Sequence, residues 1–223
     1  MAVRRAPVSR RERPAKPALT REGIVAVALR ILRDEGLERV TMRRLAQELD
    51  TGPASLYVYV RNMAELHGAL LDELLAELDP TQSGDAGVWR DELVGLLVAY
   101  TMMLLRYPSL ARSVMVLRPT GRRYLRLVET ILGLLRIGGA TARQAAWGVD
   151  ILLQQATASA AEHGTRKGSA EAEAEQEALR HALQGAPTDD YPNIAWASGD
   201  LFAGTGEERL RWGFTTLIDG LTG

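Results

Sequence analysis

Residues 41–62 read TMRRLAQELDTGPASLYVYVRN. Apolar residues at helical spacing follow Thr41 and predict a helix of roughly two turns. Asp50, Thr51 and Gly52 supply a turn. Pro53, whose fixed φ and missing N–H suit the first position of a helix, opens a second short helix that we expect to run through Val60. Two short helices joined by a tight turn predict a helix-turn-helix, in which the second helix enters the major groove of DNA.

The face of the second short helix that is not needed for packing carries aromatic and small residues. Four apolar residues can pack the two helices together: Leu45, Ala46, Leu49 and Leu56. The remaining residues are Ala54, Ser55, Tyr57, Val58 and Tyr59. Such side chains suit contacts with thymine methyl groups and, through hydroxyls, with phosphates. The alternatives are a purely structural helical hairpin and, for Tyr57, a place in the core.

Helices are predicted on both sides of this unit. Thr20 is placed to cap a preceding helix that ends at Gly36. Asn62 and Glu65 are spaced as in a capping box and begin a long helix that we expect to reach about Leu78. Three parts are therefore predicted, namely a disordered basic arm (1–17), a helix-turn-helix domain (18–65) and a helical domain (66–223).

The rest of the chain is also helical by its apolar period. Helices are predicted over about 89–107, from after 120 to 136, over 141–163 and over 207–221. Pro108 is expected to stop the first of them. Residues 170–184 are expected to form a solvated helix and 185–206 a long loop. No alternating strand pattern occurs, so the predicted fold class is all-α.

Composition narrows the possible functions. The chain has 223 residues and no cysteine, which excludes a disulfide framework and a thiolate zinc site. Residues 1–61 carry a net charge of +6 and residues 62–223 a net charge of −7, as expected for a nucleic-acid-binding domain joined to a non-binding one. The longest uncharged run, Leu93 to Leu105, is too short to span a bilayer, and no signal peptide is recognisable, so we expect a cytoplasmic protein without membrane contact.

An enzyme is the main rival class. The chain's three histidines, His67, His163 and His181, are scattered. No zinc-protease pair, glycine-rich phosphate loop or nucleophile elbow occurs. We therefore expect no catalytic residues, no metal site and no cofactor.

The stretch quoted above, together with Leu66, resembles the DNA-binding region of the tetracycline-repressor (TetR) family. The resemblance covers about residues 20–70. The C-terminal part is similar more weakly to the tetracycline-repressor subgroup, through Trp89, the tripeptide at 118–120, Tyr124 and the last predicted helix. Membership implies an all-helical homodimer with an N-terminal three-helix DNA-binding domain and a C-terminal domain that dimerises and binds an effector.

The resemblance implies a role for nine residues at the DNA. Thr41 would bind phosphate, Arg43 would face the groove and contact guanine, and amides near Asn62 would hold a further phosphate. The bases would be faced by Pro53, Ala54, Ser55 and Val58, and backbone phosphates would be reached by Tyr57 and Tyr59. In two places the chain departs from the family: Met63 replaces a phosphate-contacting Lys, and Asp50 replaces a turn Gly, which the tolerance of Asp for left-handed backbone explains.

The resemblance also implies an effector site and a dimer interface. The implied effector residues are Leu96, Tyr100, Met103, Val114, Leu117, Thr130, Leu134, Trp147, Ile151 and Gln155. Val114 stands in the segment where the tetracycline repressor has a metal-ligating His, so a magnesium-tetracycline chelate is not expected. The dimer would use 141–163 and the last helix, with contacts from Ala156, Ala158, Ser159, Ala160, Ala161, Phe214, Leu217 and Ile218.

These observations predict a homodimeric repressor that is released from palindromic operator DNA by a small, mostly apolar effector. The alternatives are a helix-turn-helix protein that activates or acts without a ligand, an architectural DNA-binding protein and an all-α enzyme.

Overall fold

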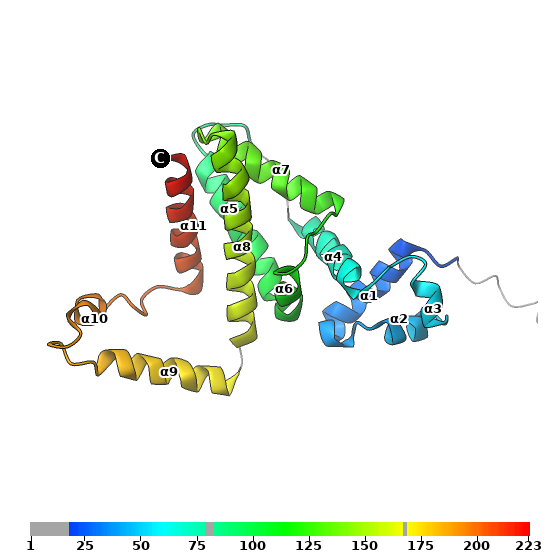
Figure 1. The fold of residues 1–223 in the computed structure, drawn as a ribbon, viewed down its shortest axis with the longest axis horizontal. Helices are drawn as coiled ribbons and strands as arrows, with labels where there is room; N and C mark the ends of the chain where they lie inside the picture. Colours follow the sequence, from blue (N-terminus) through cyan, green and yellow to red (C-terminus); the bar gives the residue numbers. More distant parts are fainter. Residues whose placement is uncertain (1–17, 79–82, 167–168) are drawn as a thin grey trace, which may run out of the picture.

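The structure is a computed structural model that describes residues 18–78, 83–166 and 169–223. Across these ranges the chain forms helices and no strand (Figure 1). The all-α prediction is therefore confirmed. The basic arm predicted for residues 1–17 lies outside the described residues.

The first four helices form the N-terminal unit. They are α1 (Arg21–Glu35), α2 (Met42–Glu48), α3 (Pro53–Leu56) and α4 (Met63–Leu74). Thr20 caps α1 by accepting a hydrogen bond from the Gly23 N–H, and Gly36 ends it with a φ of 90°. Asp50 adopts a φ of 46° in the turn after α2, as its tolerance for left-handed backbone predicts. Helix α3 is shorter than predicted, because residues 57–59 form a turn instead of continuing the helix to Val60.

The second part of the chain surrounds α5 (Trp89–Leu105). Nine of its residues are buried, as expected of a helix that is covered on most sides. It packs against α7 (Arg122–Ile137), α8 (Ala142–Arg166) and α11 (Gly206–Thr222). Leu97, Leu104 and Phe214 are fully or almost fully buried in this core.

Two helices were not predicted. Pro108 ends α5 but also occupies the first turn of α6 (Pro108–Val114), a position that proline favours. Helix α6 packs on α4 and α8. The second is α10 (Pro192–Ala197), which lies inside the predicted loop 185–206 and again begins with a proline. The prediction for α4 was too long, since the α-helix ends at Leu74 and a 3-10 turn covers Leu75–Glu77.

Helices α9 (Ala170–Gln184) and α10 leave the end of α8 and extend away from the other helices before the chain returns to α11 (Figure 1). Neither helix has a buried residue. This agrees with the prediction of a solvated helix at 170–184.

No single helix in the described ranges is long and apolar enough to cross a membrane. Helices α5 and α6 reach the length and apolar composition of a membrane span only when taken together, and the chain bends by 117° between them.

The packing predicts opposite effects for two glycine substitutions. A Cβ at Gly138, which follows α7, would lie 2.5 Å from the Trp89 ring, so Gly138→Ala should lower the free energy of unfolding by about 1–3 kcal/mol. A Cβ at Gly95, inside α5, meets nothing within 4 Å, so Gly95→Ala should raise it by up to about 1 kcal/mol. Urea unfolding of both variants measures the difference, and equal effects would contradict the described contact.

Candidate DNA interface and effector cavity

The structure places all nine residues implied at the DNA on the surface of the N-terminal unit. Tyr57 is 52% exposed and Val58 80%, so Tyr57 is not a core residue. The residues on either side of this exposed stretch point inward, since Leu56 and Val60 are at most 1% exposed. An apolar and aromatic face left in water is uncommon on a small helical unit and marks a contact surface.

Two of the nine side chains also cap helices. The Thr41 hydroxyl accepts a hydrogen bond from the Arg44 N–H at 3.1 Å, and the Asn62 side-chain oxygen accepts one from the Glu65 N–H at 2.8 Å. The Glu65 carboxylate returns to the Arg61 N–H, one residue before the predicted capping-box partner. Both caps fix where α2 and α4 begin.

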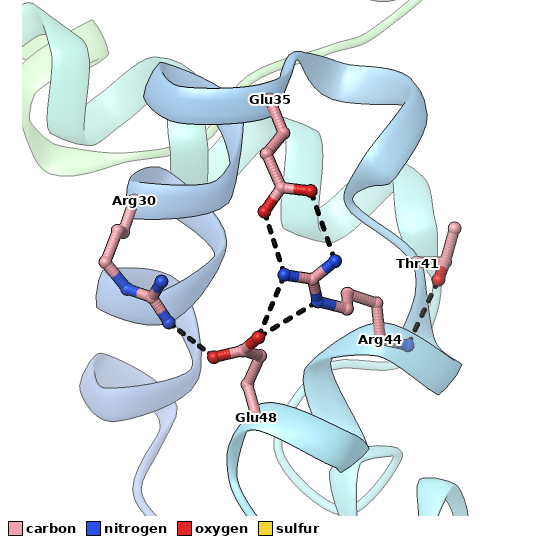
Figure 2. A network of polar contacts seen from close by, with 5 residues as sticks. All are labelled: Arg30, Glu35, Thr41, Arg44 and Glu48. Carbon is pink, nitrogen blue, oxygen red and sulfur yellow. Dashed lines mark hydrogen bonds and ion pairs between the residues drawn. The ribbon is translucent and has the colours of Figure 1, made fainter.

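A network of charged side chains holds α2 against α1 (Figure 2). The Arg44 guanidinium donates to both carboxylate oxygens of Glu35, at 2.8 and 3.1 Å, and to Glu48 at 3.0 Å. Arg30 donates to the second oxygen of Glu48 at 2.7 Å. The hydrogen bonds from Arg30 and then Arg44 hold the pKa of Glu48 below its usual range. The network fixes the angle between α2 and α1 and therefore positions the turn and α3.

Arg43 and Arg44 are adjacent but have different environments. Arg44 is half-buried in the network, whereas Arg43 is exposed. Within the part of the chain that the structure describes, no hydrogen bond or ion pair engages the Arg43 guanidinium. Arg43 thus presents an unengaged cation beside α3, while Arg44 supports the fold.

A cavity of about 410 Å³ lies between α5, α7, α8 and the loop that joins α6 to α7. This volume is in the range of small-molecule sites. Apolar walls come from Val114, Leu117, Pro119, Val128, Val149 and Leu153. Polar groups come from Tyr100, Arg118, Tyr124, Asp150, Gln154 and Thr157.

Burial raises the pKa of both phenol groups of the cavity, those of Tyr100 and Tyr124. The Tyr100 and Thr157 hydroxyls hydrogen-bond each other at 3.2 Å, and burial raises the pKa of Tyr100 well above its usual range. Burial also raises the pKa of Tyr124, and the nearby Asp150 carboxylate raises it further. Both phenols therefore stay protonated at neutral pH and can donate a hydrogen bond to a ligand.

Only three of the ten effector residues implied by the resemblance line this cavity: Tyr100, Val114 and Leu117. Four others are buried and do not line it: Leu96, Met103, Thr130 and Leu134. Trp147 and Ile151 are 65% and 45% exposed on α8 and do not line the cavity. Gln155 lines a separate groove between α5, α8 and α11.

Sequence reasoning missed Arg118, Tyr124, Asp150 and Thr157 as cavity residues. Two of them carried a sequence signal, since Arg118 and Tyr124 lie in the segment that resembles the subgroup. Asp150 and Thr157 carried no such signal, because the sequence does not show which side of α8 faces the cavity.

The residues predicted for the dimer interface are largely used inside the protomer. Phe214 and Ile218 are at most 1% exposed, and Ala156, Ser159, Ala160 and Ala161 are also buried. The small residues of α8 instead allow α5, α6 and α11 to pack closely on it. The large apolar side chains that α8 and α11 leave exposed are Trp147, Ile151 and Trp212.

The described residues contain no group of three or more His, Asp or Glu side chains placed to hold a metal ion.

Comparison with known proteins gives matches along the whole of this architecture. Residues 24–70 match the family model of bacterial regulatory proteins of the tetR family, and residues 80–223 match the model of the tetracyclin repressor-like C-terminal domain. The chain is 31% identical to the HTH-type transcriptional repressor DrrR1 of Streptomyces coeruleorubidus, over 95% of this chain and 80% of that one.

Solved structures agree. The transcription regulator SCO7704 of Streptomyces is 53% identical, with a TM-score of 0.76 over 93% of this chain and 96% of that one. ActR of Streptomyces coelicolor in complex with actinorhodin is 34% identical, with a TM-score of 0.81 over 92% and 96% of the two chains. With both parts matched in order, the chain belongs to the TetR family of bacterial transcriptional regulators.

Proposed function

We propose that this regulator is a homodimeric repressor that binds a palindromic operator through α2 and α3 and leaves it when a small molecule occupies the cavity. The observation that carries the proposal is the exposed face of α3 and the following turn, where Tyr57 and Val58 are mostly in water. Two relatives support the proposal: DrrR1 is named a transcriptional repressor, and ActR has been solved in complex with actinorhodin. The proposed function includes no catalytic step, and an operator on the chromosome would place the protein in the cytoplasm.

The proposed roles at the DNA follow from side-chain chemistry. Arg43 suits the two acceptors of guanine in the major groove. Pro53, Ala54, Ser55 and Val58 are small enough to let α3 approach base edges. Thr41, Tyr57 and Tyr59 supply hydroxyls, and Asn62 presents the first amides of α4, for phosphates.

The proposed effector is a small, mostly apolar molecule with a few hydrogen-bonding groups. Apolar walls would hold its body, while Tyr100, Tyr124 and Thr157 would fix its orientation. Arg118 and Asp150 bring charges of both signs to the same cavity.

The proposed dimer interface is the exposed face of α8 and α11 that carries Trp147, Ile151 and Trp212. These helices pack against each other within the protomer, and a second copy would cover the three side chains. Two-fold pairing of helices from both protomers makes a four-helix interface.

Selection of duplexes from random DNA by the full chain tests the function. The enriched sequences should be palindromes whose half-sites are separated by about one helical turn of DNA or a multiple of it, because a two-fold dimer presents two α3 helices. Enrichment of a single, non-repeated half-site would contradict the dimeric mode of binding, and no enrichment at all would contradict the function.

Arg43→Ala should relax the preference for one base pair in each half-site, at a cost of about 1–3 kcal/mol per site. The neighbouring Arg44→Ala is the matched control, since its guanidinium is engaged by Glu35 and Glu48. That variant should bind more weakly but select the same sequence. Repeating the selection with each variant measures this, and an unchanged preference in Arg43→Ala would exclude base readout by Arg43.

Ile151→Asp should convert the dimer to monomers, because an unpaired carboxylate would be buried at the interface. We expect the dimer dissociation constant to rise by about 100-fold or more in sedimentation equilibrium. Leu125→Asp on α7, at a residue that is 58% exposed, is the control and should remain dimeric. If Ile151→Asp stays dimeric at micromolar concentration, the interface lies elsewhere.

A further inference from the structure

One carboxylate of α4 caps the beginning of α7. Asp72 Oδ1 accepts hydrogen bonds from the backbone N–H groups of Arg123 and Tyr124, both at 2.9 Å. These amides belong to the first turn of α7, where no helical partner exists. A negative charge at this end also interacts favourably with the helix dipole. The two helices are 51 residues apart in sequence at this contact, and the Asp72 side chain is only 15% exposed.

The contact has a tight and specific geometry. A Cβ at Gly121 would lie 2.1 Å from Asp72 Oδ1, so the backbone before α7 approaches the carboxylate as closely as only glycine allows. The Arg123 guanidinium donates to Glu73 at 2.9 Å and to the Asp72 backbone oxygen at 3.4 Å. Apolar packing is non-directional and tolerates sliding, whereas the two backbone hydrogen bonds to Asp72 fix the register between α4 and α7.

One of the two residues bonded by Asp72, Tyr124, also lines the effector cavity. Tyr124 donates its backbone N–H to Asp72 and lines the cavity with the rest of the residue. Leu117, Arg118 and Pro119, in the loop before α7, line the cavity and also a larger cleft of about 750 Å³ against α1 and α4. The loop is therefore a wall shared between the cavity and the N-terminal unit.

We propose that Asp72 is the positioning residue through which occupancy of the cavity is transmitted to α4, and so to the DNA-binding unit. A ligand that displaces Tyr124 or the loop moves the amides to which Asp72 is bonded, and α4 follows. This inference rests on the proposed function.

The other polar contacts between α4 and the C-terminal part are less direct. His67 Nδ1 hydrogen-bonds the Ser113 hydroxyl of α6 at 2.7 Å, and Glu77 pairs with Arg33 and Arg106 after α4 has ended. None of these five residues lines the cavity. Asp72 is bonded to a residue that does.

Hydrogen–deuterium exchange of the first turn of α7, with the selected operator duplex as the probe, tests this inference. Coupling is reciprocal, so an operator that fixes α4 must also steady the α7 amides. In the parent chain, the duplex should slow exchange in peptides covering residues 121–125 by about fivefold or more. In Asp72→Ala, exchange there should be faster and insensitive to the duplex, although α2 and α3 are still protected by it.

Glu73→Gln is the matched control, because the Glu73 carboxylate bonds only the Arg123 side chain. This variant should behave as the parent does. Asp72→Asn keeps the shape and an acceptor oxygen without the charge, so it should retain part of the response even if Asp72→Ala unfolds. Equal slowing in the parent and in both Asp72 variants would overturn the inference, as would a parent that binds the duplex without any change at residues 121–125. Failure of the parent chain to select a duplex would instead overturn the proposed function.

Discussion

Helix α4 is packed between the N-terminal unit and the C-terminal part and contacts both. Leu66, Leu70, Leu71 and Leu74 are completely buried, although the helix has only 12 residues. It packs on α1 in the N-terminal unit and on α6 and α7 in the C-terminal part. Because close-packed interfaces change between discrete arrangements and do not deform smoothly, neither part can shift against α4 without repacking it.

Ion pairs and helix caps, in addition to the apolar core, hold the N-terminal unit rigid. Arg44, near the start of α2, pairs with Glu35 at the end of α1 and with Glu48 at the end of α2. The caps at Thr41 and Asn62 fix where α2 and α4 start. Single exposed ion pairs contribute little to stability, but a bidentate pair inside a network restricts geometry. A site that is ordered before it meets DNA loses less conformational entropy on binding. The exposed face of α3 is thus presented by a preorganised scaffold.

The parts of the structure that local chemistry controls were predictable from the sequence. Thr20 caps the start of α1 and Gly36 ends the helix. Asp50, which stands in place of a turn glycine, adopts a left-handed backbone conformation. Tertiary geometry decided the rest. Helix α8 has a buried face of mostly small residues and an exposed face that carries Trp147. Apolar periodicity therefore could not show which of its residues line the cavity and which lie on the surface. The cap by Asp72 joins residues far apart in the chain, and no local pattern marks it.

The proposed function requires the proposed effector cavity and the DNA-binding face to share one equilibrium through α4. The most direct measurement is calorimetric binding of an operator-releasing ligand to the dimer alone and to the dimer saturated with operator. Coupling through α4 predicts that the operator weakens the ligand by the same factor by which the ligand weakens the operator, typically about 5- to 150-fold. Equal ligand affinity in the two states would contradict it, and the C-terminal part would then serve dimerisation alone.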